Sequence, residues 1–578
     1  MSFSRHYQRE LLNLKELAVE FSKAHPALAP MLSGQTPDPD VERLLEGTAF
    51  LTGLLREKLE DEFPEIIHGL MDLIFPHYLR PIPSATLISF MPKPSLKESL
   101  KVPSGVQIGS VPLDGTTCLF RTCYDLDLHP LRITAAEYLQ RPGSPPRIRL
   151  ALELTGMPLS AWRPQGLRFY LAESYPDAAD LYLLLNRQVK TITFRSAAGG
   201  APATLPSTAL APGGFSAQES LLSYPRQSFP GYRILQEYFV LPEKFLFLEL
   251  RGWEAWTDRG NGSAFEISFE LAQSAHTPPR IRPESFMLFV SPAVNLFSHD
   301  ADPVVVDHRQ PEYRVRPTDR IGGHYEVHSL DRVVGMVQGS VEQRDYVPFE
   351  FFGHHEQERP IYAVARRKSP VTQALDLYLS LTYPPSSDFN SQETLSISLT
   401  CTNGTLPERL QLGDISQTTS SSPELAEFRN ILAPTAQIHP PVGSDALWHF
   451  LSHLSLNYLS VASVDTIKEL LGIYVFPEGR DRAKTAANTK RVEGIQDLQV
   501  KPVDRLVSGH MMRGREIRMK LRQDHFASPG DLFLFGTVMD YFFAVYSSIN
   551  AFTRLFVEES ITGETYAWPP RLGERFLV

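Results

Sequence analysis

The chain has 578 residues, of which 42% are hydrophobic and 21% charged, which is the composition of an ordinary soluble globular protein. Its length predicts about three or four domains, because a single core stops growing well below this size. The formal net charge of −10 argues against nucleic acid as the main partner, since phosphate binding requires a basic face.

Three helical patterns occupy the first eighty residues. The first has apolar residues on one helical stripe and ends at Pro26: Tyr7, Leu11, Leu14, Ala18 and Phe21. The second is capped by Asp38 or Asp40 and runs from Val41 to Leu59, and Pro64 begins a third. A bundle this short buries little apolar surface alone, so its stripes pack either on the rest of the chain or on helices of another subunit.

The segment Phe75–Ser84 separates two structural regimes. Its three prolines, Pro76, Pro81 and Pro83, cannot continue a helix, because each lacks a backbone N–H and restricts the residue before it. We therefore expect an extended, semi-rigid brace between the helical arm and the strands that follow.

From Thr86 to about Thr400 the pattern changes to strands. Apolar or alternating runs predict them at Thr86–Phe90, Ile148–Leu154, Leu181–Leu185, Phe245–Leu250, Phe286–Val290, Leu377–Leu381 and Leu395–Thr400. Ala197–Gly214 is the best candidate for a long mobile loop. Strands do not alternate with helices, so mixed or antiparallel sheets are expected rather than a doubly wound parallel sheet.

The C-terminal part returns to helices and one clear strand. Leu412–Ser422 is polar and rich in Ser and Thr, which predicts a linker. Helices are expected at Leu447–Leu459 and Thr466–Leu471, and a charged loop at Arg480–Arg491. Ile517, Met519 and Leu521 alternate with basic residues as in a half-buried strand. The apolar run Leu532–Ile549 contains Asp540 and keeps helical spacing, which favours a packed core helix over a membrane span.

Candidates for chemistry are weak. His324 and His328 would lie about 13 Å apart on a strand, too far for one metal ion, and His354-His355 lie nearby. Ser452, His453, Ser455 and the pair Asp524-His525 could contribute to a catalytic triad, but they fit a helix face and a turn better. We assign no catalytic, cofactor-binding or metal-binding residue.

Two basic clusters and the cysteines have simple interpretations. Arg366-Arg367-Lys368 and Arg518, Lys520 and Arg522 fit a solvated face or a protein interface better than a nucleic-acid site. The three cysteines, Cys118, Cys123 and Cys401, are sparse and unpaired in the sequence, which predicts buried free thiols in a reducing compartment. No secretory signal is visible, because the first ten residues have no apolar core region.

Longer motifs point to a family. In chain order they are His25-Pro26, Asp40–Glu46, Asp61–Pro64, Phe75–Ser84, Ser291–Phe297, Leu399–Pro407, Leu447–Ser460, Arg491–Ile495, Ser548–Thr553 and Trp568–Gly573. Together they closely resemble the TssF (VasA/ImpG) family of type VI secretion baseplate proteins over essentially the whole chain. Two positions depart from the family pattern: no basic residue follows Asn403, and His449 stands where an arginine is usual.

The resemblance implies a structural role without catalytic residues or cofactors. It implies a cytoplasmic baseplate wedge in which two copies of the chain join one TssG-like subunit. TssK, TssE and the VgrG spike hub are the other implied partners, and the wedge docks at the inner membrane complex through the baseplate. Direct membrane insertion and nucleic-acid binding are not expected. The wedge proteins of this type share an inter-subunit helical bundle, which fits the N-terminal stripes.

The expected fold class is α+β and multidomain. We divide the chain into an N-terminal helical bundle segment (1–82), a first β-rich domain (83–280), a second β-rich domain (281–411) and an α+β C-terminal domain (423–578). The alternatives are a wedge protein of another contractile injection system or phage-like tail, and a multidomain hydrolase with an unrecognised site. The hydrolase would need titratable groups that converge in a deep pocket.

Overall fold

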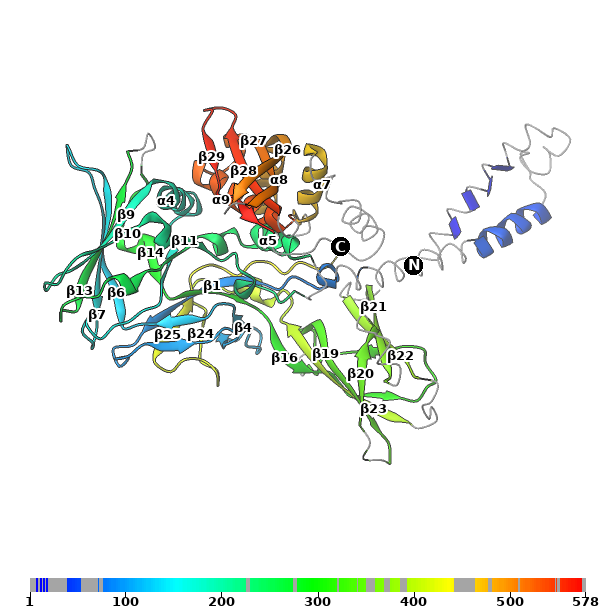
Figure 1. The fold of residues 1–578 in the computed structure, drawn as a ribbon. Coiled ribbons are helices and arrows are strands. Elements are labelled where there is room, and N and C mark those ends of the chain that lie inside the picture. Colours follow the sequence, from blue (N-terminus) through cyan, green and yellow to red (C-terminus); the bar gives the residue numbers. More distant parts are fainter. Residues whose placement is uncertain are drawn as a thin grey trace.

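The fold is α+β and multidomain, as expected from the sequence (Figure 1). In this computed structural model the described residues are 7–8, 11–12, 14–15, 17–18, 39–52, 71 and 76–573, except for 225–228, 274–277, 320–321, 340, 342, 350–358, 369–374, 385–391, 441–462, 477–480, 508–509, 546 and 548–550. Two hydrophobic cores organise them. The larger core defines what we call the body, and the smaller one defines the side module, residues 297–402.

A six-stranded antiparallel sheet forms the floor of the body. Its order is β24 (Ile415–Gln417), β3 (Gln107–Ser110), β4 (Leu119–Thr122), β15 (Val290–Val294), β1 (Ala85–Pro92) and β25 (Ala426–Asn430). Residues 83–280, 281–411 and 412–430 all contribute strands to it. This single sheet therefore contains strands from both sides of the boundaries that we drew at residues 280 and 411.

Two further antiparallel sheets belong to the body (Figure 1). One has the order β10 (Ala203–Pro206), β9 (Val189–Ser196), β13 (Ala264–Leu271), β7 (Arg147–Leu154) and β6 (Leu131–Leu139). The other has the order β11 (Leu210–Gly213), β12 (Phe247–Leu250), β8 (Leu167–Leu171) and β14 (Phe286–Leu288). A short pair, β2 (Leu100–Val102) with β5 (Leu126–Leu128), completes the set.

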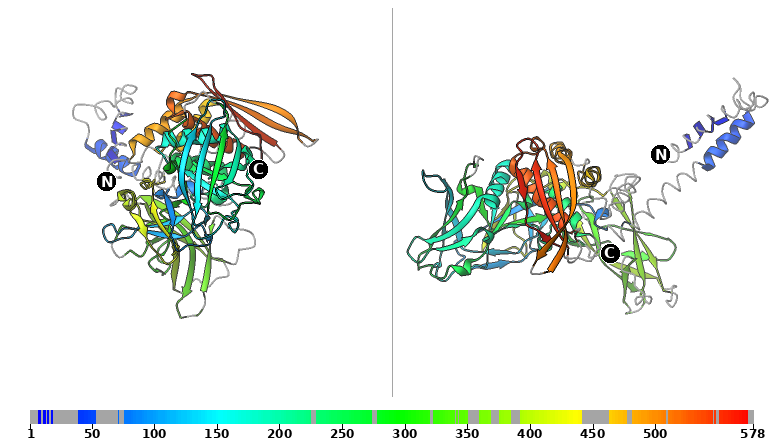
Figure 2. Two further views of the ribbon diagram at one scale, coloured as in Figure 1. Left: turned by 90° about the vertical axis from the view of Figure 1, so that its left-hand side faces the viewer. Right: turned by 45° about the horizontal axis from the view of Figure 1, so that its top comes forward.

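Helices connect these sheets to a C-terminal sheet. They are α4 (Tyr175–Gln188), α5 (Pro230–Val240), α7 (Val464–Ile473), α8 (Arg482–Glu493) and α9 (Pro529–Val545). The C-terminal sheet has β26 (Ile495–Val507), β27 (His510–Leu521), β28 (Ala551–Glu559), β29 (Thr565–Ala567) and β30 (Arg571–Leu572). Its β26–β27 hairpin extends beyond the rest of the body (Figure 2).

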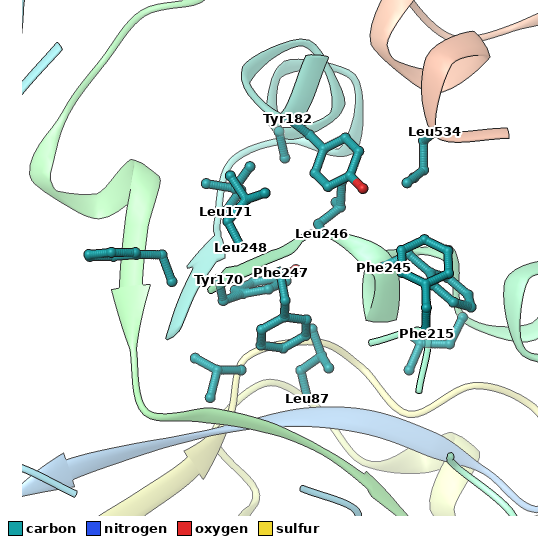
Figure 3. Close-up of a cluster of buried hydrophobic side chains, with 14 of the residues drawn as sticks. Leu87, Tyr170, Leu171, Tyr182, Phe215, Phe245, Leu246, Phe247, Leu248 and Leu534 are labelled. Atoms are coloured by element: carbon teal, nitrogen blue, oxygen red, sulfur yellow. The ribbon is translucent and has the colours of Figure 1, made fainter. Parts of the chain in front are cut away.

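Figure 3 shows how the layers of the body share one core. Leu87 of β1 lies below Phe247 and Leu248 of β12, and Tyr182 of α4 and Leu534 of α9 approach from above. The four elements come from distant parts of the chain, so the C-terminal residues are packed into the same core as the first β-rich segment.

The side module has its own eight-stranded sheet and its own core. The strands are β16 (Phe297–Asp300), β17 (Val304–Val306), β18 (Tyr313–Val315), β19 (Glu326–Val337), β20 (Gln343–Pro348), β21 (Ile361–Lys368), β22 (Leu375–Thr382) and β23 (Glu393–Thr402). Almost all strand pairs among the described residues are antiparallel, which confirms the prediction against a doubly wound sheet. The parallel pairs found there are β20–β21 and β27–β28.

The N-terminal helical patterns are confirmed where the residues are described. Described positions between Tyr7 and Ala18 and all of residues 39–52 are helical, and Lys15 pairs with Glu42 at 3.1 Å. Figure 1 shows these helical residues lying apart from the body. Most of the third expected helix, from Pro64, and the helix expected at Leu447–Leu459 lie outside the described residues.

The brace before the strands is only partly extended. Pro76–Leu79 form a 3₁₀ turn, η1, and Ile82 then pairs with Ile438 in an isolated bridge. His77, Tyr78 and Leu79 are buried, so this segment is anchored in the body by packing and not only by its prolines.

Three predicted irregular segments are ordered elements instead. Ala197–Gly214, expected as a mobile loop, contains the paired strands β10 and β11. Leu412–Ser422, expected as a linker, contains β24, and beyond it the hydroxyl of Thr419 donates to the carbonyl of Gln107 at 2.5 Å. Arg480–Arg491, expected as a charged loop, lies mostly in helix α8.

Two predicted strands are also wrong. Leu181–Leu185 belongs to helix α4. Its consecutive apolar residues are all buried, and a short apolar run of this kind cannot be told from a buried strand by periodicity. Phe286–Val290 is not one strand. Phe289 adopts φ +57° and turns the chain from β14 in one sheet to β15 in another. The helix expected from Asp531 is confirmed as α9, and the half-buried strand with Ile517, Met519 and Leu521 is confirmed as β27.

Candidate functional site

Of the histidines considered as metal ligands, His324 and His328 are described, and they lie in different surroundings. His324 precedes β19, and its Nδ1 lies 2.7 Å from the Thr116 hydroxyl. His328 lies within β19, where burial, reinforced by nearby arginines, lowers its pKa to about 3. His354 and His355 lie outside the described residues. Across the described part of the chain, no three His, Cys, Asp or Glu side chains gather as a metal site would require.

Of the possible triad members, Asp524 and His525 lie among the described residues. Asp524 and His525 lie in the 3₁₀ turn η10 (Gln523–His525) on the surface, where Asp524 pairs with Arg522 and with His525 at 3.0 Å. The hydrogen bond from Arg522 lowers the pKa of Asp524. Ser452, His453 and Ser455 lie outside the described residues.

The cysteines are free and buried, as predicted. Burial raises the thiol pKa of Cys118 to about 11, and that of Cys123 and Cys401 to about 12 each. A thiol with so high a pKa carries almost no thiolate at neutral pH, so these residues act as small apolar side chains of the core.

Several members of the two basic clusters are paired within the chain. Arg367 in β21 pairs with Glu312 at 2.7 Å and lies over the ring of Tyr378. On the outer face of the C-terminal sheet, Arg518 pairs with Glu516 at 2.7 Å, and Lys520 lies 3.7 Å from Glu558. Arg522 pairs with Asp524. Such pairs fit a solvated face or a protein surface, as the sequence suggested.

An ionic interlock joins four helices of the body. Arg491 of α8 contacts Asp531 of α9 at 3.0 Å, and the Tyr175 hydroxyl at the start of α4 donates to Asp531 at 2.7 Å. Tyr238 of α5 reaches the same carboxylate at 3.4 Å, and Arg491 also donates to the Asn488 side chain at 2.7 Å. Asp531 is fully buried, so the carboxylate fixes these helices relative to one another.

A second buried charge cluster holds the loop after β11. Glu237 of α5 accepts from Lys244 and, at 3.0 Å, from Arg233. Lys244 also donates to the Gly214 carbonyl at 2.8 Å, and the Leu221 amide donates to Glu237 at 2.7 Å. Burial lowers the pKa of Lys244, and Glu237 opposes that shift. The cluster explains why the segment that ends at Gly214 is ordered. From the sequence alone, neither Lys244 nor Asp531 stood out.

The C-terminal motif also docks onto α9. The indole of Trp568 donates to the Thr537 hydroxyl at 3.2 Å, and Arg571 pairs with Asp540. Asp540, which interrupts the apolar run of α9, is therefore a buried partner of Arg571. Among the described residues, no helix is both long enough and apolar enough to cross a membrane.

An opening of about 790 Å³ lies between α8, the end of α5 and residues 432–438. Lys484 projects to its wall, where its ammonium donates to the Val240 carbonyl. Arg491 lines it too, already engaged with Asp531. These two cations are thus engaged by the protein itself, and much of the remaining lining is apolar.

Exposed apolar side chains gather on the N-terminal helices. Leu12 and Leu17 are 61% and 59% exposed, and Leu44 and Leu51 are 72% and 62% exposed. Phe50 is also exposed, whereas Ala18 and Ala49 are buried. A helix pair with this much uncovered leucine surface is typical of a protein–protein contact.

Three comparisons identify similar proteins. The family model described as "Type VI secretion system, TssF" matches residues 1–575. The chain is 29% identical to the type VI secretion system component TssF1 of Pseudomonas aeruginosa over 624 aligned positions, covering 99% of this chain and 98% of the relative.

Two solved structures are also similar. A chain of a TssK-TssF-TssG baseplate subcomplex, determined by cryo-electron microscopy, matches with a TM-score of 0.78 and 29% identity over 92% of this chain and 98% of its own length. A chain of the type VI secretion baseplate complex matches with a TM-score of 0.62 and 25% identity over the full length of both.

Proposed function

The chain belongs to the TssF family of the type VI secretion system, and from this premise we propose that it is a non-enzymatic wedge subunit that recruits its partners through the N-terminal helices. It is a structural component of the type VI secretion baseplate. The observation that carries the proposal is the exposed leucine surface on helices that lie apart from the body. Burying such a surface against other helices gains free energy that the isolated chain forgoes.

The proposed partners are a TssG-like subunit, a second copy of this chain and a TssK-like adaptor. The baseplate subcomplex that contains a chain similar to this one is made of TssK, TssF and TssG, which supports the TssG-like and TssK-like partners. We further propose two copies of the chain per TssG-like subunit, with a TssE-like subunit and the VgrG hub as more distant partners. These last points rest on the family resemblance.

The proposed location is the cytoplasm, where the baseplate docks at the inner membrane complex. The buried interlocks of the body support a rigid scaffold, because their charged groups are engaged with one another and hold helices and loops in place. The four predicted domains, with boundaries as drawn from the sequence, remain our proposal for how the chain is divided.

Co-expression with the neighbouring TssG-like and TssK-like chains tests the proposal. We expect wild-type chain to be recovered with the TssG-like chain, and the double substitution Leu44→Glu, Leu51→Glu to reduce recovery by about tenfold or more, because charge is placed in an apolar contact. Leu412→Glu is the matched control, since Leu412 is also exposed, at 65%, but lies on the body. Equal recovery of all three proteins would refute the role of the helices.

A further inference from the structure

The side module is joined to the body by two adjacent chain crossings. The chain enters from β15, which ends at Val294, and begins β16 at Phe297. It returns at the end of β23, at Thr402, and enters the 3₁₀ turn η8 (Leu406–Arg409) of the body. Because Phe297 pairs with Cys401 across β16 and β23, the two crossings run side by side.

One asparagine from each crossing binds the other. The backbone N–H of Asn403 donates to the Asn295 side-chain oxygen at 2.6 Å. In return, the Asn295 side-chain nitrogen donates to the Asn403 side-chain oxygen at 2.8 Å. Both also bind β4 of the body: Asn295 donates to the Leu119 carbonyl at 2.8 Å, and the Leu119 amide donates to Asn403 at 3.3 Å. Both asparagines are almost fully buried.

Further polar contacts surround this pair. The Thr402 hydroxyl donates to the Gln437 side-chain oxygen at 2.7 Å, and the Gln437 nitrogen donates to Glu326 at 2.5 Å. Gly404 adopts φ +57°, and a Cβ there would lie only 2.8 Å from a carboxylate oxygen of Glu326. Any other residue at Gly404 would carry the strain of a positive φ, and its Cβ would displace the Glu326 carboxylate that Gln437 binds.

The two hydrophobic cores do not merge at this junction. The core of the side module consists of residues between Phe297 and Cys401, with Leu119 of the body packed against it. Apolar contacts have little preference for one orientation of the two units, whereas buried hydrogen bonds are directional and costly to leave unmade. The angle between body and side module is then set by the polar pair at the crossings.

We propose that Asn295 and Asn403 form a clasp that positions the side module at a fixed angle to the body. They are positioning residues: they hold two rigid units and bind no ligand. The clasp lies within Ser291–Phe297 and Leu399–Pro407, two of the segments singled out in the sequence. Its consequence for the shape of the wedge rests on the function proposed above, whereas the angle itself is a property of the isolated chain.

Distance measurements between spin labels on the full-length chain test the clasp. Labels are placed at Met336→Cys on β19 and Glu427→Cys on β25, both exposed, while the native thiols are buried. We expect a narrow distance distribution in the otherwise wild-type protein. Asn295→Ala should broaden it about twofold, because the released crossings sample several angles.

Asn430→Ala is the matched control. Asn430 is equally buried, and its side chain also forms hydrogen bonds with backbone groups, those of Ile415, Gln411 and Leu432. All of these residues lie within the body. It should lower the melting temperature as Asn295→Ala does and leave the distance distribution narrow.

A second variant, Gln437→Leu, keeps the test decisive if Asn295→Ala fails to fold. It removes the contacts to Thr402 and Glu326 and should also broaden the distribution. A distribution as narrow as wild type in the folded variants, or equal broadening by Asn430→Ala, would overturn the proposal. Because no partner is present, the result does not depend on whether the TssG-like chain is captured.

Discussion

Buried ionic side chains carry much of the order in this chain at the residue scale. Asp531 receives bonds from Arg491 and Tyr175, and Glu237 receives them from Lys244 and Arg233. Each carboxylate is fully desolvated, so its charge is acceptable only while the partners are in place. Such clusters specify one arrangement of helices and loops and tolerate few alternatives.

We expect Asp531→Asn to lower the free energy of unfolding by about 3 to 5 kcal/mol, because it leaves the Arg491 charge buried without a counterion. Chemical denaturation followed by circular dichroism measures the change. Asp524→Asn serves as the control, since its pair with Arg522 is exposed to solvent. A loss in Asp531→Asn as small as in the control would contradict the interlock.

Protonation of His129 provides a second prediction at this scale. His129 is buried beside Trp162 and hydrogen-bonded to Ser99 at 2.7 Å, and burial lowers its pKa from 6.5 to about 4. As the pH falls from about 6.5 to about 4, the unfolded chain binds the proton while the folded chain does not. Stability should therefore fall over that interval, by up to about 3 kcal/mol from this residue.

The variant His129→Gln should show a shallower decline of the unfolding free energy between about pH 6.5 and pH 4 than the wild type. Denaturant titrations at several pH values measure the slope. His308→Gln, at an exposed position of the side module, is the control and should keep the wild-type slope. An unchanged slope in His129→Gln would show that another group dominates.

At the scale of elements, the close approach of α4 and α9 determines how the C-terminal sheet packs against the other sheets of the body. Gly530 is the second residue of α9, and its amide donates to Asp180 of α4 at 2.7 Å. A Cβ at Gly530 would lie 2.1 Å from the backbone carbonyl carbon of Ala179. The absence of a side chain is thus what lets the two helices touch, and a backbone atom cannot move aside as a side chain can.

Gly530→Ala should therefore destabilise the protein by about 3 kcal/mol or more, at the upper end for overpacking. Thermal unfolding of the purified chain measures the effect. Gly472→Ala in α7 is the control, because no atom lies within 4 Å of its added Cβ, and alanine there should be neutral or slightly stabilising. A wild-type melting temperature in Gly530→Ala would show that the two helices can separate without cost.

At the scale of the whole molecule, the two cores and the N-terminal helices have different roles. The body and the side module each bury their own apolar residues, while the helices expose leucines. Stability should therefore reside in the two cores, and association in the helices. This division fits a subunit that must be folded before it joins an assembly.

Deletion of residues 1–52 tests this division. We expect the shortened chain to keep its cooperative thermal transition within a few degrees, because the core residues of the body begin at Met71. It should lose capture of the TssG-like chain in the co-expression assay. Loss of the cooperative transition would mean that the N-terminal helices stabilise the body itself.

The sequence by itself determined elements whose pattern reflects a single buried face. The stripe from Tyr7 to Ala18 and the alternation in β27 were interpreted correctly, because residue spacing alone encodes them, whereas the long motifs pointed to the family through a resemblance in their residues. The absence of strand–helix alternation likewise predicted antiparallel sheets. The motifs Ser291–Phe297 and Arg491–Ile495 were visible, but their partners were not.

Only the tertiary structure decided the remainder. Helix α4 contains the unbroken apolar run Leu181–Leu185 and α8 is mostly polar, so neither showed a clear period, and contacts with distant elements set their form. β10, β11 and β24 are short, and they become strands because neighbours pair with them. Asn295 meets Asn403, and Arg491 meets Asp531, across stretches of chain that no local pattern connects. Hydrogen bonds and ion pairs of this kind depend on three-dimensional proximity, which spacing along a sequence does not encode.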